Sequence, residues 1–178
     1  MSMIPNIEDI YNGNSKSLYF TSLRIIGNSF DAEDIMQETI IDYYKISHKQ
    51  EIKNIGGWLR SVCIRKSIDM LRQREKDNKY RDSIGDDLKN QERTQENENE
   101  GEAARLIDKI KRIILSLPGR SRMIVSLHLF EGYDYEEIAQ ITGISQSGIR
   151  SQFMRGRNKI AEELNKTEEI KSKRQIKQ

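Results

Sequence analysis

Three polar side chains, Asp34, Gln37 and Glu38, recur at the spacing of a single helix face, and Ile41 continues that spacing. Positions i, i+3, i+4 and i+7 lie on the same side of an α-helix. This side is acidic, so it can dock a protein, hold a metal ion between carboxylates, or remain a solvated stripe. A metal site needs a facing pair of carboxylates, and residues 1–30 offer only Glu8 and Asp9. Taken alone, the residues favour the solvated stripe.

A second set, between residues 58 and 72, combines arginines with an aromatic ring. At ~100° per residue, Ser61, Arg65 and Arg72 form a polar stripe that separates two apolar arcs, and Trp58 begins the helix. A basic stripe beside an aromatic ring is typical of surfaces on which unpaired nucleic-acid bases stack. Packing of Trp58 in the core, with the arginines as surface charges, explains the same pattern. Both interpretations stay open at this point.

The segment DYEEIAQITGIS, which begins at Asp134, has the pattern of a helix-turn-helix. Asp134 and Glu137 are spaced as a capping box at the start of a helix. Ala139 is small where two helices must cross closely, and Gly143 stands where the turn needs a positive φ. Ile149 lies where the second helix would bury an apolar side chain. These offsets together predict a DNA-binding unit.

The second helix of this unit has two different faces. Its inner face is apolar and contains Ile149, Phe153, Ile160 and Leu164. Its outer face suits the major groove, and these are the side chains that we expect to contact DNA: Ser147, Arg150, Ser151, Met154, Arg155 and Arg157. An ordinary amphipathic surface helix has the same periodicity, but the preceding helix and turn favour DNA binding.

The composition predicts that helices position all of these faces. The chain has only two prolines and 7% aromatic residues, which favours an all-α fold. Its mean hydropathy is −0.77, and no apolar run approaches the ~18–20 residues of a membrane span. With no signal peptide at its N-terminus, we expect a cytoplasmic protein without membrane insertion of its own. One cysteine and two histidines, His48 and His128, predict no disulfide, no metal site and no cofactor.

The net charge of +2 is unevenly distributed along the chain. It is −4 over residues 1–51, +6 over 52–81, −6 over 82–102 and +6 over 103–178. Two basic blocks on either side of an acidic one indicate two surfaces for polyanions, although solvated helix faces produce the same pattern. The acidic block is nearly free of apolar residues, which predicts a flexible linker. The expected organisation is therefore a domain over 7–81, a linker over 82–102, a second domain over 103–165 and a frayed polar tail over 166–178.

Periodicity and capping residues predict the individual helices. We expect about four in the first domain, three of them with clear bounds near 7–27, 31–45 and 58–80. We expect four in the second domain, near 103–115, 120–130, 134–142 and 145–164. Asp31 is the expected N-cap of the second helix, with Asp34 in the capping-box position. Residues 54–57 are expected to form a turn.

The order of the motifs resembles that of a known family. AEDxxQE precedes WL, nine residues and DxxR, and an acidic stretch then leads to LPxxxR and EEIA. This order is similar to that of bacterial RNA polymerase sigma factors of the sigma-70 family, in the small two-domain extracytoplasmic-function (ECF) group. The resemblance covers residues 7–165 and implies two small helical domains, sigma region 2 and sigma region 4, and a protein that is not an enzyme.

The resemblance also implies roles for the residues singled out above. Asp34, Gln37 and Glu38 would dock on the clamp helices of the polymerase β′ subunit. The −10 promoter element would be read and opened by Trp58, Arg65, Lys66 and Arg72. The outer face of the helix-turn-helix would read the −35 element, and its domain would touch the β flap. An anti-sigma factor is the further partner that the group implies.

This chain departs from the family pattern at four positions. Arg65 stands where the family usually has Asn, and Lys66 where it commonly has an apolar residue. Gly148 replaces Thr and Gly156 replaces Ala, so we expect a less rigid recognition helix, at about 1 kcal/mol for each glycine relative to alanine. Two other classes stay open. One is a helix-turn-helix regulator that acts without the polymerase core, and the other is a metal-dependent enzyme built on the acidic face.

Overall fold

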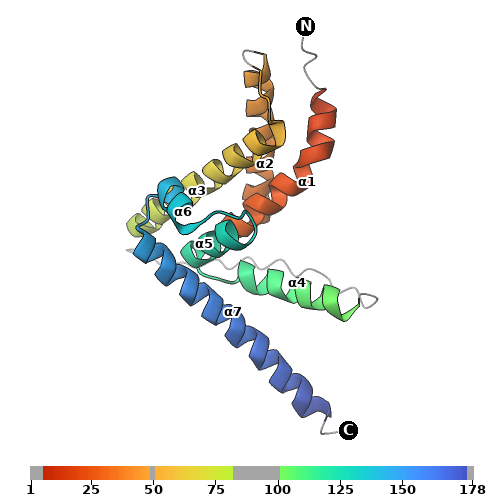
Figure 1. Cartoon of the computed structure of the whole chain (residues 1–178), viewed down its shortest axis with the longest axis vertical. Coiled ribbons are helices and arrows are strands. Elements are labelled where there is room, and N and C mark those ends of the chain that lie inside the picture. The colour runs from red at the N-terminus through yellow and green to blue at the C-terminus, as the bar shows by residue number, and fades with distance from the viewer. Residues whose placement is uncertain (1–5, 49–50, 82–100, 176–178) are drawn as a thin grey trace. The chain divides into compact units, whose positions relative to one another are not determined.

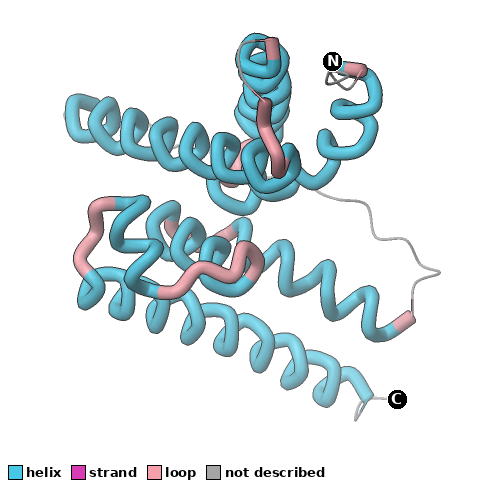
Figure 2. Tube along the Cα trace, turned by 45° about the horizontal axis from the view of Figure 1, so that its top comes forward, coloured by secondary structure: helices cyan, strands magenta, loops and turns pink. Residues whose placement is uncertain are grey.

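The structure, a computed structural model, describes residues 6–48, 51–81 and 101–175 of the 178-residue chain. Every regular element in these ranges is a helix (Figure 1, Figure 2), which confirms the predicted all-α fold. The chain divides into two compact units, Met1–Lys89 and Asn90–Gln178. The predicted linker lies outside the described residues up to position 100. No helix in the described ranges combines the length and the hydropathy that a bilayer crossing requires.

Three helices build the N-terminal unit in its described part, where about four were expected: α1 (Ile7–Ile26), α2 (Ser29–Ser47) and α3 (Ile55–Arg81). Each of them packs against the other two. The core is aliphatic and takes side chains from all three helices: Ile25, Ile26, Ala32, Ile35, Ile40, Leu59, Ile64 and Ile68. Burial of these side chains drives the packing, because each buried isoleucine or leucine contributes roughly 1.5–3 kcal/mol.

The buried side of α3 is one continuous strip. Ser67 joins the two apolar arcs expected from the sequence, because it is fully buried and its Oγ lies 3.0 Å from Ser22 Oγ and 2.8 Å from the Cys63 carbonyl. The Cys63 thiol, also fully buried, donates a hydrogen bond to the Leu18 carbonyl on α1 (3.4 Å). The opposite side of α3, with Ser61, Arg65 and Arg72, is exposed.

The structure corrects two helix starts in this unit. The N-cap of α2 is Asn28, not Asp31, and the Asn28 side chain accepts a hydrogen bond from the Asp31 amide (3.1 Å). Asp31 instead forms an ion pair with Arg74 on α3. Residues 55–57 are not a turn but the first turn of α3, because the Asn54 side chain accepts from the Gly57 amide (2.9 Å). In both cases an asparagine caps the helix earlier than expected.

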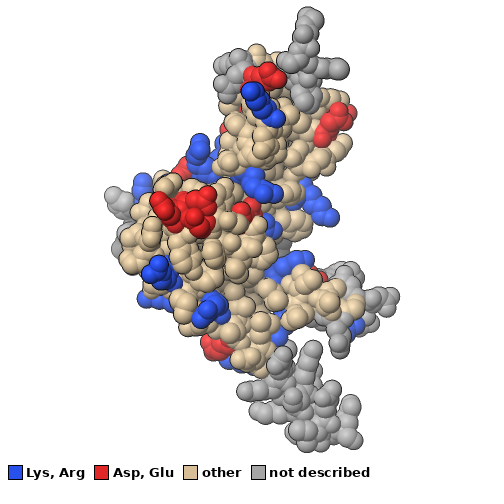
Figure 3. Space-filling view, in the orientation of Figure 1, with Lys and Arg blue, Asp and Glu red and all other residues tan. Residues whose placement is uncertain are grey.

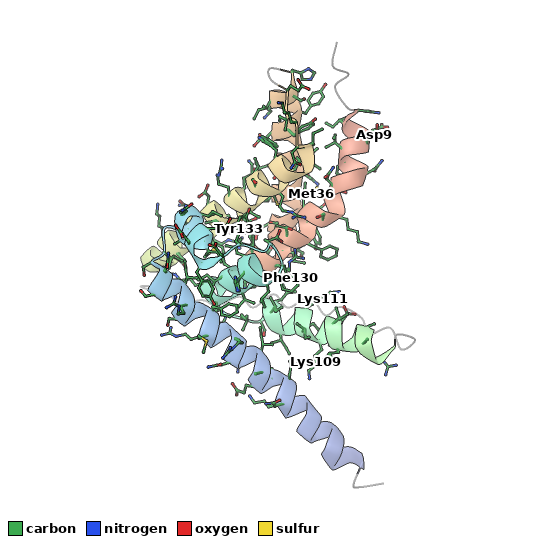
Figure 4. All side chains as sticks on the ribbon, viewed as in Figure 1. Asp9, Met36, Lys109, Lys111, Phe130 and Tyr133 are labelled. Atoms are coloured by element: carbon green, nitrogen blue, oxygen red, sulfur yellow. The ribbon has the colours of Figure 1, made fainter. Side chains whose placement is uncertain are left out.

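Four helices build the described part of the C-terminal unit: α4 (Glu102–Leu115), α5 (Gly119–Leu129), α6 (Tyr135–Thr142) and α7 (Gln146–Gln175). Residues Ile124, Leu127, Ile138 and Ile149 are fully buried, so α5, α6 and α7 share one core. Lys109 ties α4 to α7 by donating a hydrogen bond to the Leu164 carbonyl (3.3 Å) (Figure 4). The elements of this unit match the expected helices closely, except at its C-terminal end.

Helix α7 continues well past its expected end at Leu164, through most of the segment predicted to be a frayed tail. Ion pairs one helical turn apart support this extension, because Lys159 lies 3.0 Å from Glu163 and Lys166 lies 2.7 Å from Glu162. Hydrogen bonds with Glu162 and Glu163 raise the pKa of Lys166, and the bond to Lys166 lowers the pKa of Glu162. These side chains keep their opposite charges near neutral pH.

Gly156 lets α5 and α7 approach each other closely. A Cβ at this position would lie 2.7 Å from Val125 Cγ2 and 3.6 Å from both Leu117 and Ser121, closer than packing allows at Val125. Gly156 is buried. The sequence-based expectation that Gly156 only loosens the recognition helix is therefore incomplete, because the missing side chain is what the interface with α5 requires.

Replacing Gly156 by Ala should overpack this interface and lower the free energy of unfolding of the C-terminal unit by about 1–3 kcal/mol. Gly13 is the matched control, because it lies inside α1 with nothing within 4 Å of an added Cβ. Gly13→Ala should raise stability by up to about 1 kcal/mol through helix propensity. Urea denaturation followed by circular dichroism measures both. A Gly156→Ala protein as stable as Gly13→Ala would contradict the close approach.

Candidate protein-docking and nucleic-acid interfaces

The outer face of α2 carries the three side chains expected to dock a protein. Asp34, Gln37 and Glu38 are all exposed, because the opposite face of α2 is buried through Ile35, Met36, Thr39, Ile40 and Tyr43. Gln37 donates a hydrogen bond to Glu33 on the same helix (3.3 Å). The Asp34 side chain has no hydrogen-bond or ion-pair partner among the described residues. The face is therefore accessible and acidic, as its periodicity predicts.

Lys66 links this acidic face to α3. Its Nζ lies 3.0 Å from Glu38 Oε2 and 3.0 Å from Asp42 Oδ2, and its side chain is only 28% exposed. Partial burial lowers the pKa of Lys66, but the hydrogen bonds and charges of Asp42 and Glu38 outweigh it and raise that pKa above its ordinary value of 10.5. A residue expected to contact the −10 element is thus bonded to one expected to dock the polymerase.

The polar stripe of α3 is exposed along its length. Ser61, Arg65 and Arg72 all lie on the solvent side of the helix, and Arg72 pairs with Asp69 one turn earlier (3.1 Å). Trp58 is half-buried, with its ring edge-on to that of Tyr43 at a centroid separation of 5.9 Å. The structure therefore gives Trp58 a packing role and leaves the residue partly exposed at the start of the helix that carries the stripe. This half-exposed state is compatible with base stacking.

The acidic side chains of α2 do not converge on a metal site. Asp31 forms an ion pair with Arg74, and Glu38 forms one with Lys66. These two carboxylates thus face cations of α3 instead of other carboxylates. Among the side chains that the structure describes, no group of three or more His, Cys, Asp or Glu residues is placed to hold a metal ion. The arrangement of this face fits a contact surface.

Helices α6 and α7 form the predicted helix-turn-helix. The capping box is present in full: the Asp134 side chain accepts from the amides of Glu136 and Glu137 (2.8 Å each), and Glu137 accepts from the Asp134 amide (2.8 Å). Gly143 ends α6 with φ 69°, in the left-handed region. The Ser145 hydroxyl then accepts from the Gly148 amide (3.2 Å) at the start of α7.

The outer face of α7 is exposed where DNA contacts are expected: Ser147, Arg150, Ser151, Met154, Arg155 and Arg157. The inner face is anchored by Ile149, which is fully buried, and by Gln152, whose side chain accepts from the Ser121 hydroxyl (2.8 Å). In Figure 3, basic side chains lie along the first part of α7, and acidic ones gather over α6. The cationic part of the helix-turn-helix is therefore its second helix, as a phosphate-facing surface requires.

An aromatic cluster that sequence analysis missed fixes the second helix. His128 on α5 lies 4.9 Å from Tyr135 on α6 and 5.0 Å from Phe153 on α7, measured between ring centroids. Its Nδ1 lies 2.8 Å from the Tyr133 carbonyl, which orients the ring. The three residues lie on three different helices, so the periodicity of any one helix gave no signal for the cluster. The cluster joins α5, α6 and α7 through ring contacts.

Comparisons with known proteins give one family match in each of the two units. Residues 10–77 match the model of sigma-70 region 2, and residues 107–160 match that of sigma-70, region 4. The chain is 27% identical over 164 residues to the ECF RNA polymerase sigma factor SigE of Mycolicibacterium smegmatis, covering 92% of this chain and 63% of that protein. It is 23% identical over 154 residues to the ECF RNA polymerase sigma factor SigM of Bacillus subtilis, covering 86% and 92%.

The fold is similar to that of the sigma factor RpoE, solved in complex with the anti-sigma factor NepR from Bartonella quintana. The TM-score is 0.57 at 19% identity, and the match covers 89% of this chain and 96% of that one. In the part of the chain that the structure describes, the fold and the exposed faces define a helical protein of two units, with a helix-turn-helix in the C-terminal unit. The chain belongs to the sigma-70 family of RNA polymerase sigma factors, in the ECF group.

Replacing Lys66 by Ala should remove both ion pairs and leave Glu38 and Asp42 as like charges one turn apart. We expect the free energy of unfolding to fall by about 1 kcal/mol near pH 7. Because folding raises the pKa of Lys66, this stabilisation is present below pH 10.5 and is lost as the pH rises through the folded-state value. The difference between wild type and variant should therefore fade in alkali.

Lys45→Ala is the control for Lys66→Ala. Lys45 also pairs with Asp42, but at 4.0 Å and with a side chain that is 70% exposed, so its removal should cost almost nothing. Urea denaturation of both variants near neutral pH and in alkali measures the effect. Equal stabilities for the two variants, or a loss for Lys66→Ala that persists unchanged in alkali, would contradict the ion-pair account.

Proposed function

We propose that this chain binds core RNA polymerase and directs promoter-specific transcription initiation by recognising −10 and −35 elements and assisting strand opening. The observation that carries the proposal is the pairing, in one chain, of an accessible acidic face on the region 2 unit with a basic outer face on the region 4 helix-turn-helix. A regulator that only binds an operator has no use for the first of these faces. For that reason the alternative of a polymerase-independent regulator is not favoured.

In the region 2 unit, Asp34, Gln37 and Glu38 contact the clamp helices of the polymerase β′ subunit. The exposed stripe of α3 takes the promoter strand near −10, with Arg65 and Arg72 facing the DNA and the accessible part of Trp58 available for stacking. Unlike the other residues expected to contact the −10 element, Lys66 already forms ion pairs with Glu38 and Asp42 in the unbound chain. Its contribution to DNA binding requires that these bonds be exchanged.

In the region 4 unit, the outer face of α7 reads the −35 element in the major groove, and the unit also touches the β flap. Arginine at a base edge pairs bidentately with guanine, and arginine farther along the helix meets phosphate. The chain itself catalyses no reaction, since phosphodiester bonds form in the polymerase. It acts in the cytoplasm, and an anti-sigma factor that covers these faces is its further partner.

Replacing Asp34 by Arg tests the docking role. Asp34 is exposed, so the fold and the circular dichroism spectrum should stay unchanged while affinity for core polymerase falls at least tenfold through charge repulsion. Asp9→Arg makes the same charge change at an exposed position on α1 and should bind like wild type. Fluorescence anisotropy of the labelled full chain against purified core measures both. Native affinity in the Asp34→Arg protein would show that this face does not dock.

Replacing Arg150 by Ala tests the register of the recognition helix. Loss of a bidentate contact to guanine costs about 1–3 kcal/mol, so selection should relax at one or two −35 positions while core binding is unchanged. Arg157→Ala is the matched variant and should weaken transcription about equally from all −35 sequences, as expected for a phosphate contact. Transcription by reconstituted holoenzyme from a randomised −35 library distinguishes them. Wild-type selectivity in the Arg150→Ala protein would place the register elsewhere.

A further inference from the structure

The exposed face of α2 is longer and more apolar than the three docking residues alone indicate. A stripe of exposed side chains runs along the helix: Phe30, Asp34, Gln37, Ile41 and Tyr44. Phe30 is 71% exposed, the largest value among the exposed large hydrophobic residues of the described chain, and Ile41 is 47% exposed. The polar pair Asp34 and Gln37 thus lies between two apolar side chains that the described fold leaves uncovered.

The spacing of this stripe alternates between four and three residues. This alternation is the seam of a coiled coil, in which side chains keep facing one partner helix over several turns. Two helices that pack in this way cross at about 20° and bring their seams into contact along their length. The stripe on α2 therefore fits a partner that is itself a helix or a helical hairpin.

The charge on the face restricts the partner further. Lys66 engages Glu38, whereas Asp34 in the middle of the stripe has no ion-pair partner among the described residues. Glu33 lies beside the stripe, is exposed and accepts a hydrogen bond only from the neutral Gln37 in the described contacts. The uncompensated charge on this side is therefore negative, and a complementary helix carries Arg or Lys opposite Asp34.

We propose that Phe30 and Ile41 are the apolar anchors of the docking face and pack between the side chains of a basic helical segment of core RNA polymerase. This inference rests on the proposed function: it adds Phe30, which the motif does not contain, and gives Ile41, which the spacing places on the same face, a role in binding. Phe30 lies one turn before Asp34, and Ile41 lies one turn after Gln37. The two anchors therefore lie on either side of the polar contacts, and a few large side chains often carry most of the affinity of an interface.

The experiment measures binding of the labelled full chain to purified core polymerase for Phe30→Ala and Ile41→Ala. Phe20→Ala is the matched control, because Phe20 is a phenylalanine on α1 of the same unit and is also exposed (43%). We expect at least a tenfold loss of affinity for Phe30→Ala, about a fivefold loss for Ile41→Ala and less than a twofold change for Phe20→Ala, as for an aromatic anchor and its weaker aliphatic companion.

Salt separates an apolar anchor from a charge effect. The loss in Phe30→Ala should persist when the salt concentration is raised, whereas the loss in Asp34→Arg should shrink as charges are screened. Thermal melting of each variant checks the fold. Should Phe30→Ala melt early, Phe30→Gln keeps a good helix-forming residue at the position while removing the ring, and it should show the same tenfold loss.

The outcomes separate the anchor from the proposed function. If wild type binds core and both Phe30 variants bind equally well, the anchor is wrong and the proposed function stands. An equal loss in Phe20→Ala would also overturn the anchor, because the effect would not belong to the α2 face. If wild type itself fails to bind core, the proposed function fails, and the anchor fails with it.

Discussion

The packing of α3 against both α1 and α2 is the constraint on which the geometry of the region 2 unit depends. Its buried strip is held by apolar contacts and by specific bonds on each side, with Ser67 against Ser22 on α1 and Lys66 against Glu38 on α2. A helix held on two neighbours has only one rotation about its axis that satisfies both. The exposed stripe with Arg65 and Arg72 therefore has a fixed direction, and so has the acidic face of α2 beside it.

In the region 4 unit, different contacts fix the rotation of the recognition helix α7 about its axis. Here the missing side chain of Gly156 brings α7 close to α5, and the ring of His128 packs against both Tyr135 and Phe153. Close backbone approach and aromatic packing both fix the rotation of α7, because neither tolerates a shift of a fraction of an ångström. These contacts therefore also fix the direction in which the arginines of the outer face point.

The features that the sequence predicted correctly are local ones. The capping box at Asp134, the left-handed Gly143 and the exposure of Asp34, Gln37 and Glu38 follow from residues within one or two turns of each other. The predictions were wrong or incomplete at positions whose contacts come from a residue far away in the sequence. Asp31 is a good N-cap by type, yet its carboxylate pairs with Arg74, forty-three positions away, and Asn28 caps the helix instead. The ion pairs of Lys66 with Glu38 and Asp42 had no signal in the local sequence, because they depend on the packing of α2 against α3. Gly156 was expected only to loosen its helix, and its close approach to Val125 depends on the packing of α5 against α7. The roles of the site residues follow from family resemblance and exposure, and they stay predictions.

Cys63 has a practical consequence for studying this chain. It is the only cysteine among the 178 residues, and its thiol lies fully buried in the region 2 unit with its hydrogen directed at the Leu18 carbonyl. An alkylating reagent reaches a thiolate, which forms only when the surrounding helices separate. The rate at which the native chain consumes such a reagent therefore reports the opening free energy of one unit within the intact two-unit protein. The sequence thus contains its own site-specific probe of local unfolding, with no engineered label.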